Sequence, residues 1–121
     1  MEAMIAVVIV GIIAAIAWPT YESQSRRSRR TDAVKALTIA AIEMERCQSD
    51  DGFYCSYSAT SPDGYYTVAV NTSITGGGFI LTATPDPNQV QADDADCTTL
   101  TLDHLGRKGY TGATTNIKRC W

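Results

Sequence analysis

The chain has 121 residues and a formal net charge of −3, which allows one folded domain and an additional apolar segment but excludes a second core. So mild a charge indicates no particular class of partner. The four cysteines form no C-x-x-C motif and His104 is the single histidine, so the composition disfavours a zinc site and predicts no cofactor.

The first distinctive feature is the apolar run Glu2–Trp18, EAMIAVVIVGIIAAIAW, which Pro19 closes. No monomer can expose such a run to water, so it predicts insertion into a membrane or burial in the core of an assembly. A charge at membrane depth is costly, and Glu2 therefore needs a partner or a position among the lipid headgroups. A cleaved signal peptide is less well supported, because the early residues lack positive charge and the helical pattern continues beyond Ala15-Ile16-Ala17.

A second helical pattern follows without a break, since residues 20–30 contain no glycine or proline. Its apolar positions recur at spacings of four and three, as one face of an amphipathic helix does. These positions are Ala33, Leu37, Ala40, Met44 and Cys47. The simplest interpretation is one helix from the N-terminus to about Cys47, roughly 70 Å long. Gly11 lowers helix propensity and Pro19 removes a backbone hydrogen bond, so we expect the helix to be kinked or locally melted between them.

A cluster of four arginines follows directly on the apolar run. Its members are Arg26, Arg27, Arg29 and Arg30. Contact with anionic lipid, a positive-inside topology signal and nucleic-acid binding are the functional interpretations. The simpler interpretation is a solvated or intersubunit helix face, with Glu22 and Asp32 as partners at helical distance. No aromatic residue interleaves with the arginines, so a stacking platform for nucleic acid is unsupported.

The rest of the chain predicts an antiparallel sheet. After a polar loop from Gln48 to Gly64, β-rich runs at Tyr65–Asn71 and Phe79–Thr84 are joined as a hairpin by a segment that ends in three glycines. Cys97–Asp103 alternates as a third strand, and Tyr110–Trp121 adds a short fourth one after a turn bracketed by Gly106 and Gly109.

The predicted fold class is therefore α+β, with one long helix packed on an antiparallel sheet of three or four strands. Residues 1–30 form the protruding apolar half of the helix with its basic end. Residues 31–121 form the globular head, which at about ninety residues is marginal in size without covalent help.

The cysteines supply such help if they are oxidised. An even number of cysteines behind an export-type N-terminus predicts disulfides and an extracytoplasmic location. Three pairings of the four residues are possible. Proximity in sequence favours Cys47–Cys55 and Cys97–Cys120, each contributing about 2.5 to 3.5 kcal/mol by loop closure.

No pattern supports catalysis. His104 follows Asp103, but adjacent residues of a strand face opposite sides and no nucleophile motif accompanies them. The acidic residues at 93–96 lack the glycine and the distal glutamate of a calcium loop. The glycosylation motif at residues 71–73 is a common chance match in a hairpin turn. We therefore predict neither an enzyme nor a metal site.

Glu2 followed by AMIAVVIVGIIAAIAWPTY resembles the N-terminal segment of type IV pilins, in which a glutamate opens an apolar helix that runs through a glycine to a proline and a tyrosine. Gly11, Pro19 and Tyr21 occupy these positions. The long helix, the following loop, the antiparallel sheet and a C-terminal loop bounded by a disulfide are also similar, so the resemblance covers the whole chain. The ending, LTLDHLGRKG through Cys120-Trp121, resembles pilins and minor pilins related to the neisserial major subunit.

The resemblance implies a subunit that waits in the inner membrane and is then extruded by an assembly ATPase and a platform protein into a helical filament on the bacterial surface. Glu2 would form the assembly salt bridge with the N-terminal amine of a neighbouring copy, and Gly11 to Pro19 would lose helicity in the filament. The family pattern also places a leader and a processed residue before the glutamate, so we expect residues upstream of Met1. The side chains expected to pack in the filament core are Met4, Ile5, Val7, Val8, Ile9, Ile12, Ile13, Ile16 and Trp18.

Several functions fit this pattern. The favoured hypothesis is a structural filament subunit that supports motility, adhesion or DNA uptake. The alternatives are a minor pilin or type II secretion pseudopilin at the tip of a filament, and a bitopic membrane protein with a small periplasmic binding domain. DNA capture would need an exposed basic patch in the head, and its only candidates are Arg107, Lys108, Lys118 and Arg119.

Overall fold

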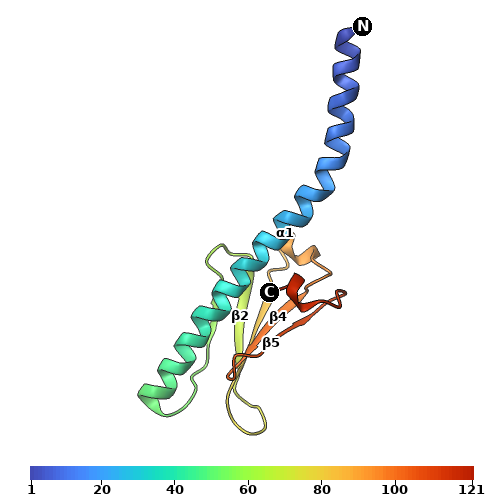
Figure 1. Cartoon of the computed structure of the whole chain (residues 1–121). Helices are drawn as coiled ribbons and strands as arrows, with labels where there is room; N and C mark the ends of the chain where they lie inside the picture. Colours follow the sequence, from blue (N-terminus) through green and yellow to red (C-terminus); the bar gives the residue numbers. More distant parts are fainter.

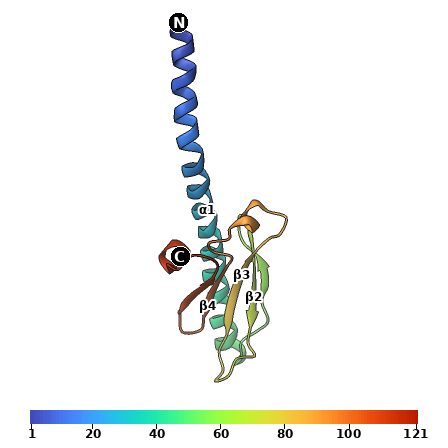
Figure 2. The ribbon, with the colours of Figure 1, turned by 90° about the vertical axis from the view of Figure 1, so that its right-hand side faces the viewer.

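The computed structural model describes residues 1–121 and consists of one long helix and a five-stranded sheet (Figure 1). The helix α1 spans Glu2–Asp51; its C-terminal half lies on one face of the sheet and its N-terminal half extends away from the head (Figure 2). The strands are β1 Ser58–Thr60, β2 Tyr66–Asn71, β3 Ile80–Pro85, β4 Thr99–Asp103 and β5 Lys108–Thr111, and two short 3-10 helices are η1 Val90–Asp93 and η2 Ile117–Arg119. The predicted α+β fold class is confirmed.

Helix α1 is continuous through Gly11 and Pro19, so the chain described here is not melted between them. The helix bends instead, and its apolar half points in a different direction from the half that lies on the sheet (Figure 1). A proline inside a helix accounts for such a bend, because it lacks the N–H of one backbone hydrogen bond. The predicted end at Cys47 was four residues too early. Gly52, at φ 79°, ends the helix after Asp51, and its N–H donates to the Gln48 carbonyl at 3.0 Å.

The sheet is an antiparallel meander in which the strands lie in chain order from β1 to β5. It has one strand more than the predicted maximum, because residues 58–60 leave the polar loop to pair with β2, Ser58 lying opposite Ala69. The last strand runs over Lys108–Thr111 and not over the predicted Tyr110–Trp121. Gly109 lies inside β5 opposite Thr101, and the residues after Thr111 form a loop and η2. A three-residue edge strand carries too little alternation to be recognised in sequence.

One hydrophobic core lies between α1 and the sheet. Four of the five residues of the predicted helix face, Ala33, Leu37, Ala40 and Met44, are fully buried. The fifth, Cys47, is half-buried and forms a disulfide with Cys55. The sheet contributes inward-facing residues at alternate positions, as the pleat requires. These are Tyr66, Val68, Leu81, Ala83 and Leu100, joined by Phe79 just before β3. The opposite face of the sheet carries threonines, so only the helix side of the head is dry.

Candidate functional site

The apolar half of α1 is exposed along its whole length. All nine residues expected to pack in a filament core are exposed, and the least exposed of them, Ile9, still presents 51% of its surface. By length and composition this stretch of α1 can cross a membrane, and none of it is buried against the rest of the chain. An apolar surface of this extent requires lipid or other protein around it.

The polar and flexible positions of this half have no partner in the head. Glu2 lies in the first turn of α1, and no ion pair of the chain includes it. Around Gly11 no heavy atom lies within 4 Å of the point that a Cβ would occupy, so a closely approaching neighbour has room there. Near Pro19, the hydroxyl of Thr20 donates to the Ile16 carbonyl at 3.4 Å.

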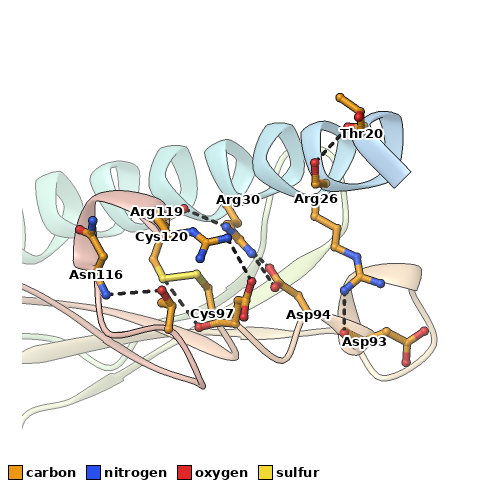
Figure 3. Close-up of polar contacts among 12 residues, drawn as sticks. Thr20, Arg26, Arg30, Asp93, Asp94, Cys97, Asn116, Arg119 and Cys120 are labelled. Carbon is orange, nitrogen blue, oxygen red and sulfur yellow. Dashed lines mark hydrogen bonds and ion pairs between the residues drawn. A yellow bond between two sulfur atoms is a disulfide. The ribbon is translucent and has the colours of Figure 1, made fainter. Parts of the chain in front are cut away.

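The arginine cluster is divided between two environments. Arg26 donates to Glu22 Oε1 at 2.7 Å, which confirms Glu22 as a partner. Arg26 also donates to the Asp93 carbonyl at 3.2 Å (Figure 3). Arg30 turns inward and is buried. The remaining two arginines make no ion pair, although the guanidinium of Arg29 lies 5.5 Å from the centre of the Tyr65 ring. The cluster is therefore partly a solvated face and partly a structural joint.

That joint is a network of buried polar groups around Arg30, hereafter the Arg30 network. Arg30 donates from Nε and Nη2 to the two oxygens of Asp94, both at 2.6 Å, and from Nη1 to the carbonyl of Arg119 at 2.8 Å (Figure 3). Gln91 Nε2 donates to Asp94 Oδ2 at 2.8 Å and to the Tyr66 hydroxyl at 2.9 Å. One guanidinium thus joins α1 to the segment around η1 and to the C-terminal segment.

The electrostatics of the Arg30 network follow from its burial. The side chains of Arg30 and Asp94 are 9% and 1% exposed, so each charge relies on the other in place of water. Hydrogen bonding to Asp94 raises the pKa of Arg30 above its usual range. Burial raises the pKa of the Tyr66 hydroxyl to about 12. Both Asp94 oxygens accept from Arg30, and no group of three or more His, Cys, Asp or Glu side chains is placed to hold a metal ion.

Asp32 has a role that the sequence did not indicate. The predicted pairing of Asp32 with the arginine cluster is wrong. The Asp32 carboxylate instead accepts hydrogen bonds from the Ser61 hydroxyl and from the backbone N–H of Asp63, the latter at 2.9 Å. This buried carboxylate ties the loop before β2 to the helix. Its sequence signal is weak: an acidic residue directly before the first core alanine of the helix.

The two disulfides join Cys47 to Cys55 and Cys97 to Cys120, the pairing that proximity in sequence favours. The first ties the end of α1 to the following loop. The second ties the start of the segment leading into β4 to the C-terminal residues, directly beside the Arg30 network (Figure 3).

The basic residues near the C-terminus do not form a free patch. Arg107 Nε donates to Asp103 Oδ2 at 2.6 Å, and Arg119 Nη2 forms an ion pair with Asp96 Oδ2 at 3.6 Å. Burial acts to raise the pKa of Asp103, but hydrogen bonds from the backbone and side chain of Arg107 outweigh it, so that this pKa is lowered. Lys108 and Lys118 make no ion pair.

The C-terminal Trp121 covers the outer edge of the sheet. Its indole N–H donates to the Gly109 carbonyl on β5 at 2.9 Å, and the ammonium of Lys108 lies 5.2 Å from the centre of its ring. The outer edge strand therefore has one backbone acceptor already satisfied.

Comparison with known proteins identifies this arrangement. The family described as type IV minor pilin ComP, DNA uptake sequence receptor, matches residues 19–101, more than half of the chain. The chain belongs to this type IV pilin family. The solved structure of a type IV pilin from Shewanella oneidensis is 37% identical, with a TM-score of 0.57 over 79% of this chain and 97% of that one. No curated protein matches the sequence.

The resemblance to type IV pilins is thereby confirmed, and the long helix on an antiparallel sheet is the pilin fold. Pilins are structural proteins, so this pilin is not an enzyme. The family match begins at Pro19, after the apolar run. The roles of Glu2, Gly11 and the apolar core residues therefore remain predictions.

Proposed function

We propose that this pilin is a subunit of a helical type IV pilus that is held in the inner membrane before assembly and polymerises through the apolar half of α1. The supporting observation is the exposed run from Glu2 to Trp18, which extends from a head that is already fully folded around its own core. Lipid covers this run before assembly, and the same runs of neighbouring subunits cover it afterwards. An assembly ATPase and a platform protein would drive the transfer.

In this proposal Glu2 specifies how neighbouring subunits align. A carboxylate in an apolar bundle is expensive unless it is paired, and Glu2 has no partner within its own chain. The N-terminal amine of a neighbouring copy would supply that partner and thereby fix the register. Pro19 inside α1 and the open surface around Gly11 mark the segment that would lose helicity when subunits pack together.

A second candidate function is that of a minor pilin, present in few copies at the tip or along a filament built from another subunit. The family match favours it, because that family is described as a minor pilin and a DNA uptake sequence receptor. The head offers less support for DNA binding. Residues 31–121 carry six basic and eleven acidic side chains, a net charge of −5. Only Lys108 and Lys118 of the four candidate cations are unpaired, whereas DNA binding relies on clustered cations.

Electron cryomicroscopy of filaments sheared from the cells that produce the protein tests these functions. If the chain fits the repeating density with residues 1–19 at the axis, it is the structural subunit. If another pilin fits the repeat and mass spectrometry finds this chain in the same filaments at low stoichiometry, it is a minor pilin. If no filament contains it and it stays in the membrane fraction, the filament hypothesis fails and the bitopic hypothesis replaces it.

Two variants sharpen this test. Glu2→Ala removes the proposed assembly charge and should leave the protein in the membrane fraction, whereas Glu2→Asp keeps the charge and should still support assembly. The head lies far from residue 2 (Figure 1), so both variants should fold alike. Equal assembly of the two variants would contradict the role proposed for Glu2.

A further inference from the structure

A polar groove lies beside α1 where the helix leaves the head toward its apolar half. The groove has a volume of about 490 Å³ and is lined by Ser25, Ser28 and Arg29 of the helix and by Asp63 and Tyr65 of the loop before β2. That loop lies at the end of the head nearest the apolar half of α1 (Figure 1). The groove is therefore close to the position at which the apolar run of a membrane-held subunit enters the lipid.

The groove contains two charges of opposite sign that have no partner. Arg29 is half-buried, with its guanidinium 5.5 Å from the centre of the Tyr65 ring, and Asp63 is exposed. Arg29 and Asp63 form no ion pair with one another or with any other side chain. The hydroxyls of Ser25 and Ser28 lie on the same wall as Arg29 and can donate hydrogen bonds. One wall of the groove thus offers donors to an anion, and the other offers a carboxylate to a cation.

The wall that carries Asp63 is held in place by the buried carboxylate of Asp32. This carboxylate accepts from the backbone N–H of Asp63 at 2.9 Å, from the backbone N–H of Tyr65 at 3.4 Å and from the Ser61 hydroxyl. These hydrogen bonds use the backbone of Asp63 and leave its side chain free. The fold therefore fixes the two walls relative to one another before a ligand binds, which lowers the entropic cost of binding.

The groove lies at the height of the lipid headgroups. Trp18 and Tyr21 are both exposed, and such aromatic side chains favour the boundary between hydrocarbon and headgroups. Ser25 and Arg29 follow Tyr21 by four and eight residues, which is about 6 and 12 Å along the helix. The headgroup layer is about 5–8 Å thick on each side of a bilayer. Helical side chains lean toward the N-terminal end of their helix, so both side chains reach back toward this layer.

From these observations we infer that the groove binds the phosphoethanolamine headgroup of a phospholipid in the membrane leaflet that faces the head. The phosphate would accept hydrogen bonds from Arg29 and the two serine hydroxyls, and the ammonium, two carbons away, would donate to Asp63. The inference rests on the proposed function, and within it only on the state held in the membrane before assembly. A purely anionic ligand such as the backbone of DNA fits less well, because it offers no cation to Asp63.

Native mass spectrometry of the full chain in detergent micelles tests the inference. Phosphatidylethanolamine and phosphatidylcholine with identical acyl chains are added in equal amounts; the two differ only in the ammonium, which in choline has no N–H to donate. The wild type should retain the ethanolamine lipid about three- to fivefold more than the choline lipid. Asp63→Asn should remove this preference, and Arg29→Gln should lower the retention of both lipids about three- to fivefold.

The matched control is Arg27→Gln. Arg27 is also exposed and unpaired, but it lies two residues from Arg29 and therefore about 200° around the helix. It lines a separate groove with Thr31, Arg119 and Trp121, and no acidic side chain contributes to that groove. This variant should keep the wild-type preference for the ethanolamine lipid. Thermal unfolding of each variant checks that the head remains folded.

Three outcomes would overturn the inference. The first is equal retention of the two lipids by the wild type, or an unchanged preference in Asp63→Asn. The second is retention of phosphatidylglycerol above phosphatidylethanolamine that depends on Arg29, which would indicate a site for anionic lipid. The third is displacement of phosphatidylethanolamine by duplex DNA that depends on Arg29, which would indicate a nucleic-acid site.

Failure of the proposed function is detected separately by flotation of the full chain with vesicles of phosphatidylethanolamine and phosphatidylglycerol. A chain that does not float with these vesicles is not held in a membrane, and the proposed function and this inference then fail together. A chain that floats with the vesicles but shows no preference for the ethanolamine lipid overturns this inference alone.

Discussion

The Arg30 network should carry a large share of the stability of the head. We expect Asp94→Asn to lower the free energy of unfolding by about 3–5 kcal/mol, the range for removing one partner of a buried ion pair. The Arg30 guanidinium stays charged because arginine does not lose its proton in proteins, and its side chain is 9% exposed. Asparagine replaces one carboxylate oxygen by an NH2 group, and because Arg30 donates to both Asp94 oxygens, one Arg30 donor would face a donor in either orientation of the amide.

The assay is thermal unfolding of the full chain in detergent micelles without reductant, followed by circular dichroism. For a head of about ninety residues, 3 kcal/mol corresponds to a fall in Tm of at least about 12 °C. The matched control is Asp50→Asn, which breaks the 3.7 Å ion pair between Asp50 and Arg46. The side chain of Arg46 is 71% exposed and that of Asp50 is 68% exposed. Exposed pairs of this kind contribute about 0.3–0.5 kcal/mol.

A third variant separates the ion pair from packing. The double change R30M/D94L replaces the pair by apolar side chains and should recover most of the stability lost in Asp94→Asn, because no buried charge is left alone. If Asp94→Asn shifts Tm no more than Asp50→Asn does, the pair is not desolvated as the structure indicates and the reasoning is refuted.

Three further predictions follow from the head. Tyr66 has a pKa near 12 in the folded chain and about 10 unfolded, so its contribution is fully present below pH 10 and is lost as the pH rises through 12. Linkage gives a fall of about 1.3 kcal/mol between pH 9 and pH 11; Tyr66→Phe should flatten that fall in urea unfolding at pH 9, 10 and 11, and an unchanged slope would contradict it. Gly112→Ala should unfold at a markedly lower temperature, because Gly112 has a φ of +143° and an added Cβ would overlap the backbone carbonyl oxygen of Asp96. A variant as stable as the wild type would show that this close approach is absent. Replacing Cys97 and Cys120 by serine should cost about 3.4 kcal/mol by loop closure over 23 residues, measured by denaturant unfolding; a loss below about 1 kcal/mol would show that the C-terminal segment is held without the bond.

Much of the fold could be predicted because it is encoded locally. The spacing of Ala33, Leu37, Ala40 and Met44 records the 3.6-residue period of a helix with one buried face, and all four are buried. Runs rich in β-favouring residues identified β2 and β3, alternation identified β4, and the glycine-rich segment identified the hairpin between β2 and β3. Where alternation was too short, as in β1, the prediction failed.

The candidate site was predicted only in part. The sequence by itself determined that an apolar run preceded by a charge must be covered by lipid or by other subunits, since no fold of so short a chain could bury it. Proximity along the chain also favoured the two disulfides, because short loops close most easily.

Only the tertiary structure decided which charges are free and which are structural. Arg30 and Arg27 are alike in sequence, yet Arg30 is buried against Asp94, 64 residues away, while Arg27 remains exposed and unpaired. Asp32 likewise binds a loop about thirty residues further on. The helical and strand periods of the sequence show which face of an element is buried. They do not show which distant residue a buried charge will pair with, because that partner is fixed only when the sheet folds against the helix and removes both groups from water.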